Sequence, residues 1–223
     1  LVRDFIFITE DKNNYMRIFA KKNNILCFDH DPNIGGRFSI FSITSLLPLI
    51  SIGYSLPKII KSFIEAKKLF EKNHRDLSKY TLYSIAYEKK FDLNILVGLS
   101  YHDKINAVNE WYRQIFAESL GKNKNAKNYI SSYGSIDQHS QFQLYIDGPY
   151  DKHFNFFKIK NNNKAVNSNA SLIKGYNLMS TLENGAIKTL QQKKFLVTQI
   201  SIDDDFNSYC YLLFYLIFDI YLR

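Results

Sequence analysis

Asn94-Ile95-Leu96-Val97-Gly98-Leu99 is the stretch of this sequence that decides its fold. The run is apolar throughout and lacks the polar–apolar alternation of a half-exposed strand. Such a run is typical of a central strand in a parallel sheet, which helices bury on both faces. Residues 103–119 follow as a predicted helix with Asp103 as its candidate N-cap. A strand followed by a helix is the repeating unit of a parallel α/β fold.

The same alternation extends to both sides of this stretch. Further strands are predicted near 4–9, 25–29, 154–159 and 195–202. Helices are predicted over 13–22, over 39–54 as a buried helix, from Pro57, and over 77–89, 138–146, 178–192 and 207–222. Residues 121–135 and 161–171 read as loops because Asn, Lys, Ser and Gly dominate them. We therefore expect one α/β domain over residues 1–223, a flavodoxin-like, doubly wound three-layer sandwich with a mostly five-stranded parallel sheet.

Composition narrows the class of partner. The chain has 223 residues and a net charge of +8, but its lysines occur as scattered pairs rather than as one basic run. This indicates a solvated surface and no nucleic-acid partner. Cys27 and Cys210 stand alone in apolar surroundings, so we expect reduced thiols and no metal.

The most apolar stretch, 209–222, is shorter than the ~20 residues of a membrane span and contains Asp219. No cleavable signal is visible, and the sequence starts in an apolar, strand-like run. We expect a buried helix at 209–222, no membrane partner and a cytoplasmic protein.

Gly35-Gly36-Arg37 follows the predicted strand at 25–29. Two glycines let the backbone approach a ligand closely, and the N-terminus of the helix behind them favours an anion, beside which Arg37 would stand. Taken alone, the tripeptide also fits a tight turn with a surface arginine.

Two more side chains have suitable chemistry. Glu118 lies at the end of a predicted helix, and His139 lies in a polar run, 137–141, that opens an otherwise apolar helix. Each alone fits a structural role. Together with Arg37 they supply the base, acid and cation that move a proton between neighbouring carbons through an enediolate. We expect Arg37, Glu118 and the start of the His139 helix to border one cleft at the carboxyl ends of the strands.

In this order the segments resemble the glucose-6-phosphate isomerase family. The resemblance rests on Asn33-Ile34-Gly35-Gly36-Arg37-Phe38-Ser39, on Ala117-Glu118-Ser119-Leu120-Gly121-Lys122 and on residues 137–149, and it runs from about Phe5 to Leu222. It implies a sugar-isomerase (SIS) fold that binds a carbohydrate derivative and needs no cofactor. It also implies the aldose–ketose isomerisation of glucose 6-phosphate and fructose 6-phosphate through a cis-enediol, in glycolysis and gluconeogenesis.

The resemblance also assigns roles to residues. Glu118 becomes the base that shuttles the proton between C1 and C2, and His139 opens the sugar ring. Arg37, together with Gly35, Gly36 and Gln138, contacts the substrate. In the family this histidine reaches the site of the neighbouring subunit, which implies a homodimer. The sequence departs from the family pattern at Ile43, Ser45 and Tyr129.

Family members are longer, so we expect the chain to be truncated at both ends. The resemblance places the Ser/Thr-rich phosphate loop before this sequence, and a lysine that assists ring opening after it. Two readings follow. In the first, the chain is part of a larger or split enzyme, and a complementing N-terminal fragment supplies the missing part. In the second, it is a decayed or repurposed sugar-phosphate-binding module without catalysis. Without the phosphate-binding loop, the chain alone is predicted to isomerise the sugar phosphate poorly.

Overall fold

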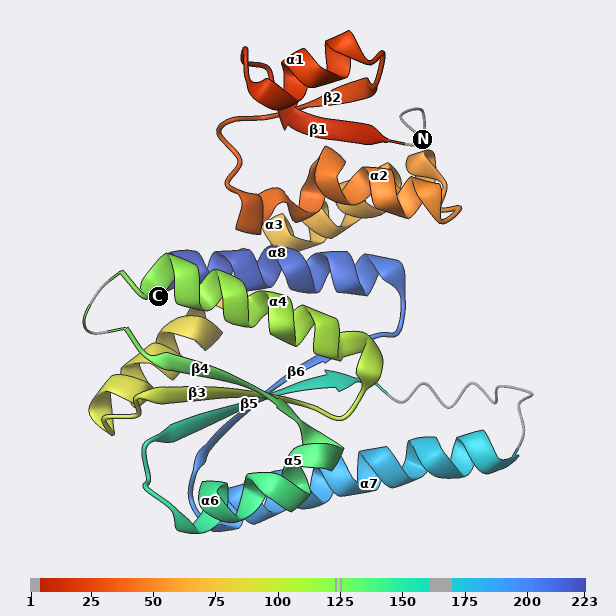
Figure 1. Cartoon of the computed structure of the whole chain (residues 1–223). Coiled ribbons are helices and arrows are strands. Elements are labelled where there is room, and N and C mark those ends of the chain that lie inside the picture. The colour runs from red at the N-terminus through yellow and green to blue at the C-terminus, as the bar shows by residue number, and fades with distance from the viewer. Residues whose placement is uncertain (1–4, 123, 125, 161–169) are drawn as a thin grey trace. The chain divides into compact units, whose positions relative to one another are not determined.

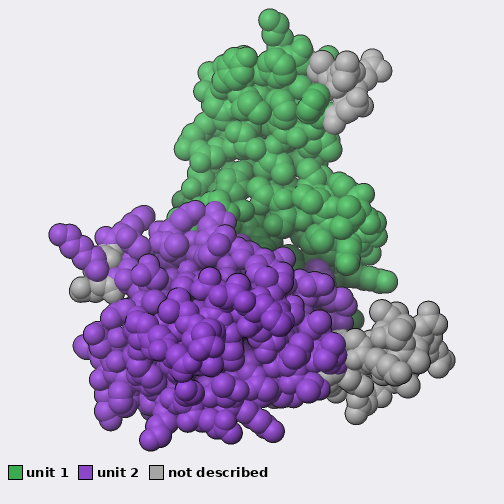
Figure 2. Space-filling view, turned by 60° about the horizontal axis from the view of Figure 1, so that its bottom comes forward, with its two compact units in different colours: residues 1–65 green, residues 66–223 purple. Residues whose placement is uncertain are grey.

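The computed structural model describes residues 5–122, 124, 126–160 and 170–223 (Figure 1). Helices alternate with parallel strands along these residues, which confirms the predicted α/β class. The chain divides into two compact units, residues 1–65 and 66–223 (Figure 2). The longest helix, α3 (Leu56–Lys90), begins in the first unit and continues into the second.

The first unit opens with a strand–helix–strand motif. Its elements are β1 (Ile6–Glu10), α1 (Tyr15–Lys22) and β2 (Leu26–His30), and the two strands pair in parallel. Asn14 caps α1 by accepting a hydrogen bond from the backbone N–H of Arg17 at 3.0 Å. The Phe7 and Phe19 rings stack at 6.2 Å and so pack α1 against β1.

The predicted buried helix over 39–54 is two shorter elements, the 3-10 helix η2 (Gly36–Phe41) and α2 (Ile43–Ser51). The break lies at Ser42, whose extended backbone ends η2 and whose Oγ accepts a hydrogen bond from Thr44 N–H at the start of α2. Neither element contains a fully buried residue, so the prediction that this segment is packed on both sides is wrong. The helix predicted from Pro57 and the one predicted at 77–89 are both parts of α3, because residues 69–76 contain no Gly or Pro to end it.

The second unit holds a four-stranded parallel sheet. Its strands are β3 (Ile95–Ser100), β4 (Asn128–Tyr133), β5 (Lys152–Ile159) and β6 (Leu196–Ile202), in the order β4-β3-β5-β6. β3 lies inside the sheet and is almost wholly buried, as its apolar run predicts. The loop predicted over 121–135 is wrong in part, because residues 128–133 form the strand β4. The expected five-stranded sheet is also corrected, because the described strands form one sheet of two and one of four.

Helices cover both faces of this sheet. On one face lie α4 (Asp103–Leu120) and α8 (Phe206–Leu222); on the other lie α5 (Gly134–Ser140), α6 (Phe142–Asp147) and α7 (Ala170–Gln192) (Figure 1). The helix predicted over 138–146 is thus two short helices that start earlier, at Gly134. His102, not Asp103, is the N-cap of α4. Residues 161–169 of the predicted loop 161–171 lie outside the described residues, and α7 begins at Ala170.

Gly98 lets α4 approach the sheet closely. The side-chain amide of Asn109 donates to the Gly98 carbonyl oxygen at 2.8 Å, and Tyr129 donates to Asn109 Oδ1. A Cβ atom on Gly98 would overlap both side chains. A glycine in β3 therefore sets the position of α4, the helix that carries Glu118 in its last turn.

The cysteines behave as expected, since Cys27 is partly buried, Cys210 is buried, and both thiols are free. Among the described residues, no helix is both long and apolar enough to cross a membrane.

Candidate functional site

Glu118 lies exposed in the last turn of α4. One helical turn earlier, the side-chain amide of Gln114 donates a hydrogen bond to Glu118 Oε1 at 2.9 Å. Residues four apart share one side of a helix, so Gln114 orients the carboxylate without covering it. The result is an exposed carboxylate that accepts a hydrogen bond from a neutral donor.

Glu118 lies at the amino ends of the strands. α4 starts just after the carboxyl end of β3 and runs back antiparallel to it, which returns its last turn to the opposite edge. The residues that follow Glu118, Ser119 and Leu120, line a pocket together with Lys127, which directly precedes β4. The expectation that Glu118 borders a cleft at the carboxyl ends is therefore wrong.

The pocket beside the end of α4 has a volume of about 390 Å³. Lys122, Lys127 and Arg223 line it, with the buried carboxylate of Glu88 among them. Glu88 lies 3.0 Å from Lys127 and 3.0 Å from Arg223, and Asp219 lies 2.7 Å from Arg223. Glu88 and Asp219 thus balance the charges of Lys127 and Arg223, and Lys122 is the remaining cation of the described lining.

His139 is exposed on α5, on the other face of the sheet from α4 (Figure 1). Asp137 fixes the start of this helix at the carboxyl end of β4 by accepting hydrogen bonds from Tyr133 N–H at 2.8 Å and Ser132 Oγ at 2.7 Å. The start of the His139 helix therefore lies where the sequence predicts. Within one chain, His139 and Glu118 do not come together, and Gln138 stands half-buried next to His139.

Arg37 belongs to the first unit, in η2, where its guanidinium lies 5.0 Å from the centre of the Phe38 ring. Gly35 has an ordinary extended backbone, and a Cβ on Gly36 would meet no atom within 4 Å. Neither glycine is thus required by the described structure around it. Because Arg37 and Glu118 belong to different units, a shared cleft stays a prediction.

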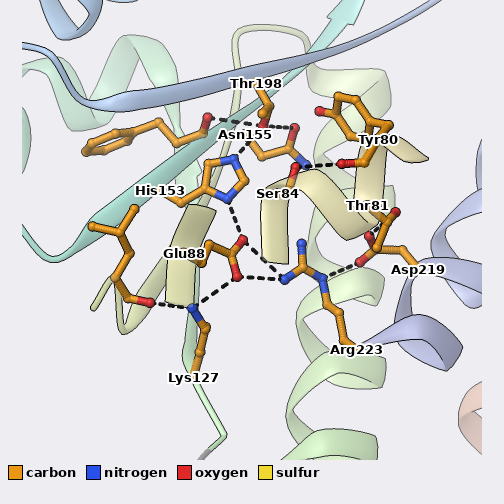
Figure 3. A network of polar contacts seen from close by, with 12 residues as sticks. Tyr80, Thr81, Ser84, Glu88, Lys127, His153, Asn155, Thr198, Asp219 and Arg223 are labelled. Carbon is orange, nitrogen blue, oxygen red and sulfur yellow. Dashed lines mark hydrogen bonds and ion pairs between the residues drawn. The ribbon is translucent and has the colours of Figure 1, made fainter. Parts of the chain in front are cut away.

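A buried polar network that the sequence did not predict crosses the second unit (Figure 3). Glu88 Oε1 lies 2.7 Å from His153 Nδ1, and His153 Nε2 lies 2.6 Å from Thr198 Oγ1. Arg223 bridges the two carboxylates Glu88 and Asp219. The members come from α3, β5, β6 and α8, so the network joins elements far apart in sequence.

Electrostatics fix the protonation states in the network. Burial raises the pKa of Glu88, but the hydrogen bond with His153 and the charges of Arg223 and Lys127 outweigh it and lower that pKa to about 2. Burial lowers the pKa of His153. A neutral imidazole donates through Nδ1–H to Glu88 and accepts at Nε2 from the Thr198 hydroxyl.

This order of carboxylate, imidazole and hydroxyl matches that of a hydrolytic triad. However, Glu88 is 1% exposed and His153 is 2% exposed, and the adjoining cavity measures about 10 Å³. Such a cavity holds at most one water molecule. The imidazole of His153 and the hydroxyl of Thr198 therefore have no access to a substrate, and we interpret the network as structural. In the part of the chain that the structure describes, no three His, Cys, Asp or Glu side chains are placed to hold a metal ion.

Comparison with known proteins gives no matching family model. The chain is 36% identical over 169 residues to the glucose-6-phosphate isomerase of Campylobacter jejuni, a match that covers 74% of this chain and 41% of that protein. It is also 36% identical over 160 residues to the glucose-6-phosphate isomerase of Methanocaldococcus jannaschii, covering 70% and 39%. The chain thus spans about two fifths of the length of these curated relatives.

A solved structure of a hypothetical protein from Thermus thermophilus shares the fold, with a TM-score of 0.81 and 21% identity over 99% of this chain and 57% of that one. Fold and relatives together define the class of this protein as that of the α/β sugar-phosphate isomerases. By its sequence, the chain belongs to the glucose-6-phosphate isomerase family and corresponds to part of the length of these members.

Proposed function

We propose that this chain is the part of a glucose-6-phosphate isomerase that supplies the proton-transferring base, Glu118. The observation that carries the proposal is the exposed carboxylate of Glu118, held at 2.9 Å by Gln114 in a chain of this family. The base takes the proton from C2 of open-chain glucose 6-phosphate, and O1 gains a proton, so that C1 and C2 become the cis-enediol. Return of the proton to C1, with loss of the proton on O2, gives fructose 6-phosphate. This places the reaction in glycolysis and gluconeogenesis.

The other predicted residues have supporting roles in this proposal. Arg37 stabilises the enediolate oxygen, and the open space at Gly36 supports a close approach of ligand to that backbone. His139 opens the sugar ring, with Gln138 beside it. Since His139 and Glu118 lie on opposite faces of one sheet, we assign His139 to the site of a neighbouring subunit in a homodimer.

The partner that completes the site is the remainder of such an isomerase, in the same or another polypeptide. The chain spans about 41% of its Campylobacter jejuni relative, so the phosphate-binding elements that the family resemblance implies would come from that remainder. A sugar phosphate is the proposed substrate and the cytoplasm the proposed location, which cell fractionation would test.

Complementation tests the function. The purified chain is assayed for glucose 6-phosphate isomerisation alone, and again when mixed with the part of the Campylobacter jejuni enzyme that it does not match. That part mixed with its own matched half is the positive control. We expect turnover in the mixture and no useful turnover by the chain alone. The reason is that the binding energy of the phosphate group orients the reacting carbons. Inactivity in the mixture, beside an active control, would favour a non-catalytic sugar-phosphate-binding module.

A further inference from the structure

The first unit has almost no core of its own. Among its described residues, 5–65, only Ala20, Ile25 and Ile59 are buried. A unit of this size needs a well-filled core to be stable. Instead it exposes large apolar side chains on β1, α1 and β2, which we call the open surface: Ile6, Tyr15, Met16, Ile18 and Leu26.

The two strands have the sequence of interior strands. Ile6-Phe7-Ile8 and Leu26-Cys27-Phe28 are apolar without alternation, as in strands that helices cover on both faces. Yet Ile6 and Leu26, which are partners in the register, are 46% and 56% exposed. A parallel sheet of only two strands is not stable by itself, and each strand keeps one unpaired edge among the described residues.

The helix α1 repeats this mismatch. Phe19 and Ala20 pack it onto the sheet, but Tyr15 and Ile18 are 76% and 52% exposed. A surface helix normally turns polar side chains to solvent on the side away from its sheet. The sequence of α1 therefore fits a helix that is covered on more than one side.

A second copy of the chain does not fit this surface. Identical edge strands related by a two-fold axis run antiparallel, so a symmetric dimer cannot extend a parallel sheet. What extends it is a different strand, with its own crossover connection. The curated relatives are isomerases that contain much more chain than this sequence spans.

We propose that the open surface is an interface that receives further parallel strands from the part of a glucose-6-phosphate isomerase that this sequence does not span. These strands continue the β1–β2 sheet. The chain attached to them covers Tyr15 and Ile18 on the side of α1, and Ile6 and Leu26 on the other face of the sheet, since Phe7, which packs against α1, and Ile6 point to opposite faces. The identity of the partner rests on the proposed function, but the interface needs no turnover.

Binding tests the interface. The full chain is mixed with the unmatched part of the Campylobacter jejuni isomerase, and complex formation is followed by light scattering and by amide hydrogen exchange. In the chain alone, we expect the amides of β1 and β2 to exchange rapidly because the sheet is open. In the mixture, we expect a one-to-one complex in which exchange of these amides slows by about tenfold or more.

Substitutions locate the contact. Ile6→Lys and Leu26→Lys should weaken the complex by about tenfold or more, since each places a charge in a buried apolar contact. Leu82→Lys and Leu144→Lys, at residues of the second unit that are 51% and 54% exposed, are the matched controls and should leave it unchanged. All four positions are exposed, so the variants should fold like the parent.

Several results would overturn the proposal: slow exchange of β1 and β2 in the chain alone, self-association that Leu26→Lys abolishes, or a fragment that binds its own matched half but not this chain. A complex without turnover would reject the proposed function and leave the interface standing. Turnover in a complex that Ile6→Lys does not weaken would reject the interface and leave the proposed function standing.

Discussion

The amide of Gln114 holds the carboxylate of Glu118 at 2.9 Å, one turn away on the exposed side of α4. The residue types around Glu118 predict its chemistry, whereas no motif points to Gln114. The signal was present in the spacing, because residues four apart on a helix meet on one side. The pair gives an exposed glutamate a fixed orientation.

Gln114→Met should lower kcat in the complemented mixture by about tenfold, with a smaller effect on KM, because the base loses orientation and not substrate contacts. Steady-state kinetics of the mixture measure this. Arg113→Met, at an exposed neighbour that pairs with Glu110, is the control and should leave kcat unchanged. An equal loss in both variants would mean that the helix end, and not the hydrogen bond, was perturbed.

Glu88→Ala should destabilise the second unit by about 3–5 kcal/mol, because it leaves Arg223 and Lys127 without their buried partner. Urea unfolding followed by the fluorescence of Trp111, the one tryptophan of the sequence, measures this in α4. Glu71→Ala removes an exposed carboxylate of α3 that lies 3.7 Å from Lys67. It should cost less than about 1 kcal/mol, and similar costs for the two variants would contradict the importance of the network.

Acid should destabilise the second unit in two steps. The pKa of His153 is lowered by burial from its ordinary 6.5, so the unfolded chain takes up a proton first as the pH falls below about 6.5. The pKa of Glu88 is raised by burial but lowered more by His153 and Arg223, to about 2 from 4.5. Its contribution, about 3 kcal/mol, is complete above pH 4.5 and is lost as the pH falls towards 2.

Urea midpoints measured from about pH 7 to about pH 3 check this dependence. We expect a decline that begins near pH 6.5 and steepens below pH 4.5. Glu88→Gln should flatten the lower part of the curve. A wild-type midpoint that stays constant over this range would show that the Glu88–His153 pair does not stabilise the fold.

Two buried tyrosines should respond in opposite ways to loss of the hydroxyl group. Among the residues that the structure describes, the Tyr80 hydroxyl is buried with no hydrogen-bond partner, whereas Tyr112 donates a hydrogen bond to Asp219. Tyr80→Phe should leave the free energy of unfolding unchanged or raise it, and Tyr112→Phe should lower it by about 1–3 kcal/mol. Urea unfolding of both variants tests the contrast, and a large cost at Tyr80 would indicate a partner such as a bound water.

The sequence predicts three strands of the four-stranded sheet but misses β4, one of its two edge strands. The apolar run of β3 predicts a strand because burial on both faces leaves a composition that no loop shares. β4, at the edge, has the polar sequence Asn128-Tyr129-Ile130-Ser131-Ser132-Tyr133 within an Asn- and Lys-rich stretch. Its side chains bind across to α4, as Tyr129 does with Asn109 and Ser131 with Glu110, and no local pattern reveals such partners.

The site was only partly predictable for a similar reason. The residue types around Glu118 and Arg37 suggest their chemistry, but the edge of the sheet at which Glu118 lies depends on the direction of α4. The buried network depends on Glu88 meeting His153 and Arg223, which are 65 and 135 residues away. Contacts of this kind are set by the tertiary fold, and a single sequence does not contain them.

Proton transfer in heavy water tests the central claim, that Glu118 is the isomerase base, most directly. The chain mixed with the unmatched part of the Campylobacter jejuni enzyme is supplied with glucose 6-phosphate, and deuterium at C2 is measured together with turnover. We expect incorporation with the wild-type chain, a loss of about 10²–10⁴-fold in both quantities with Glu118→Gln, and no loss with Glu110→Gln on the same helix. Wild-type rates of incorporation and turnover with Glu118→Gln would contradict the account.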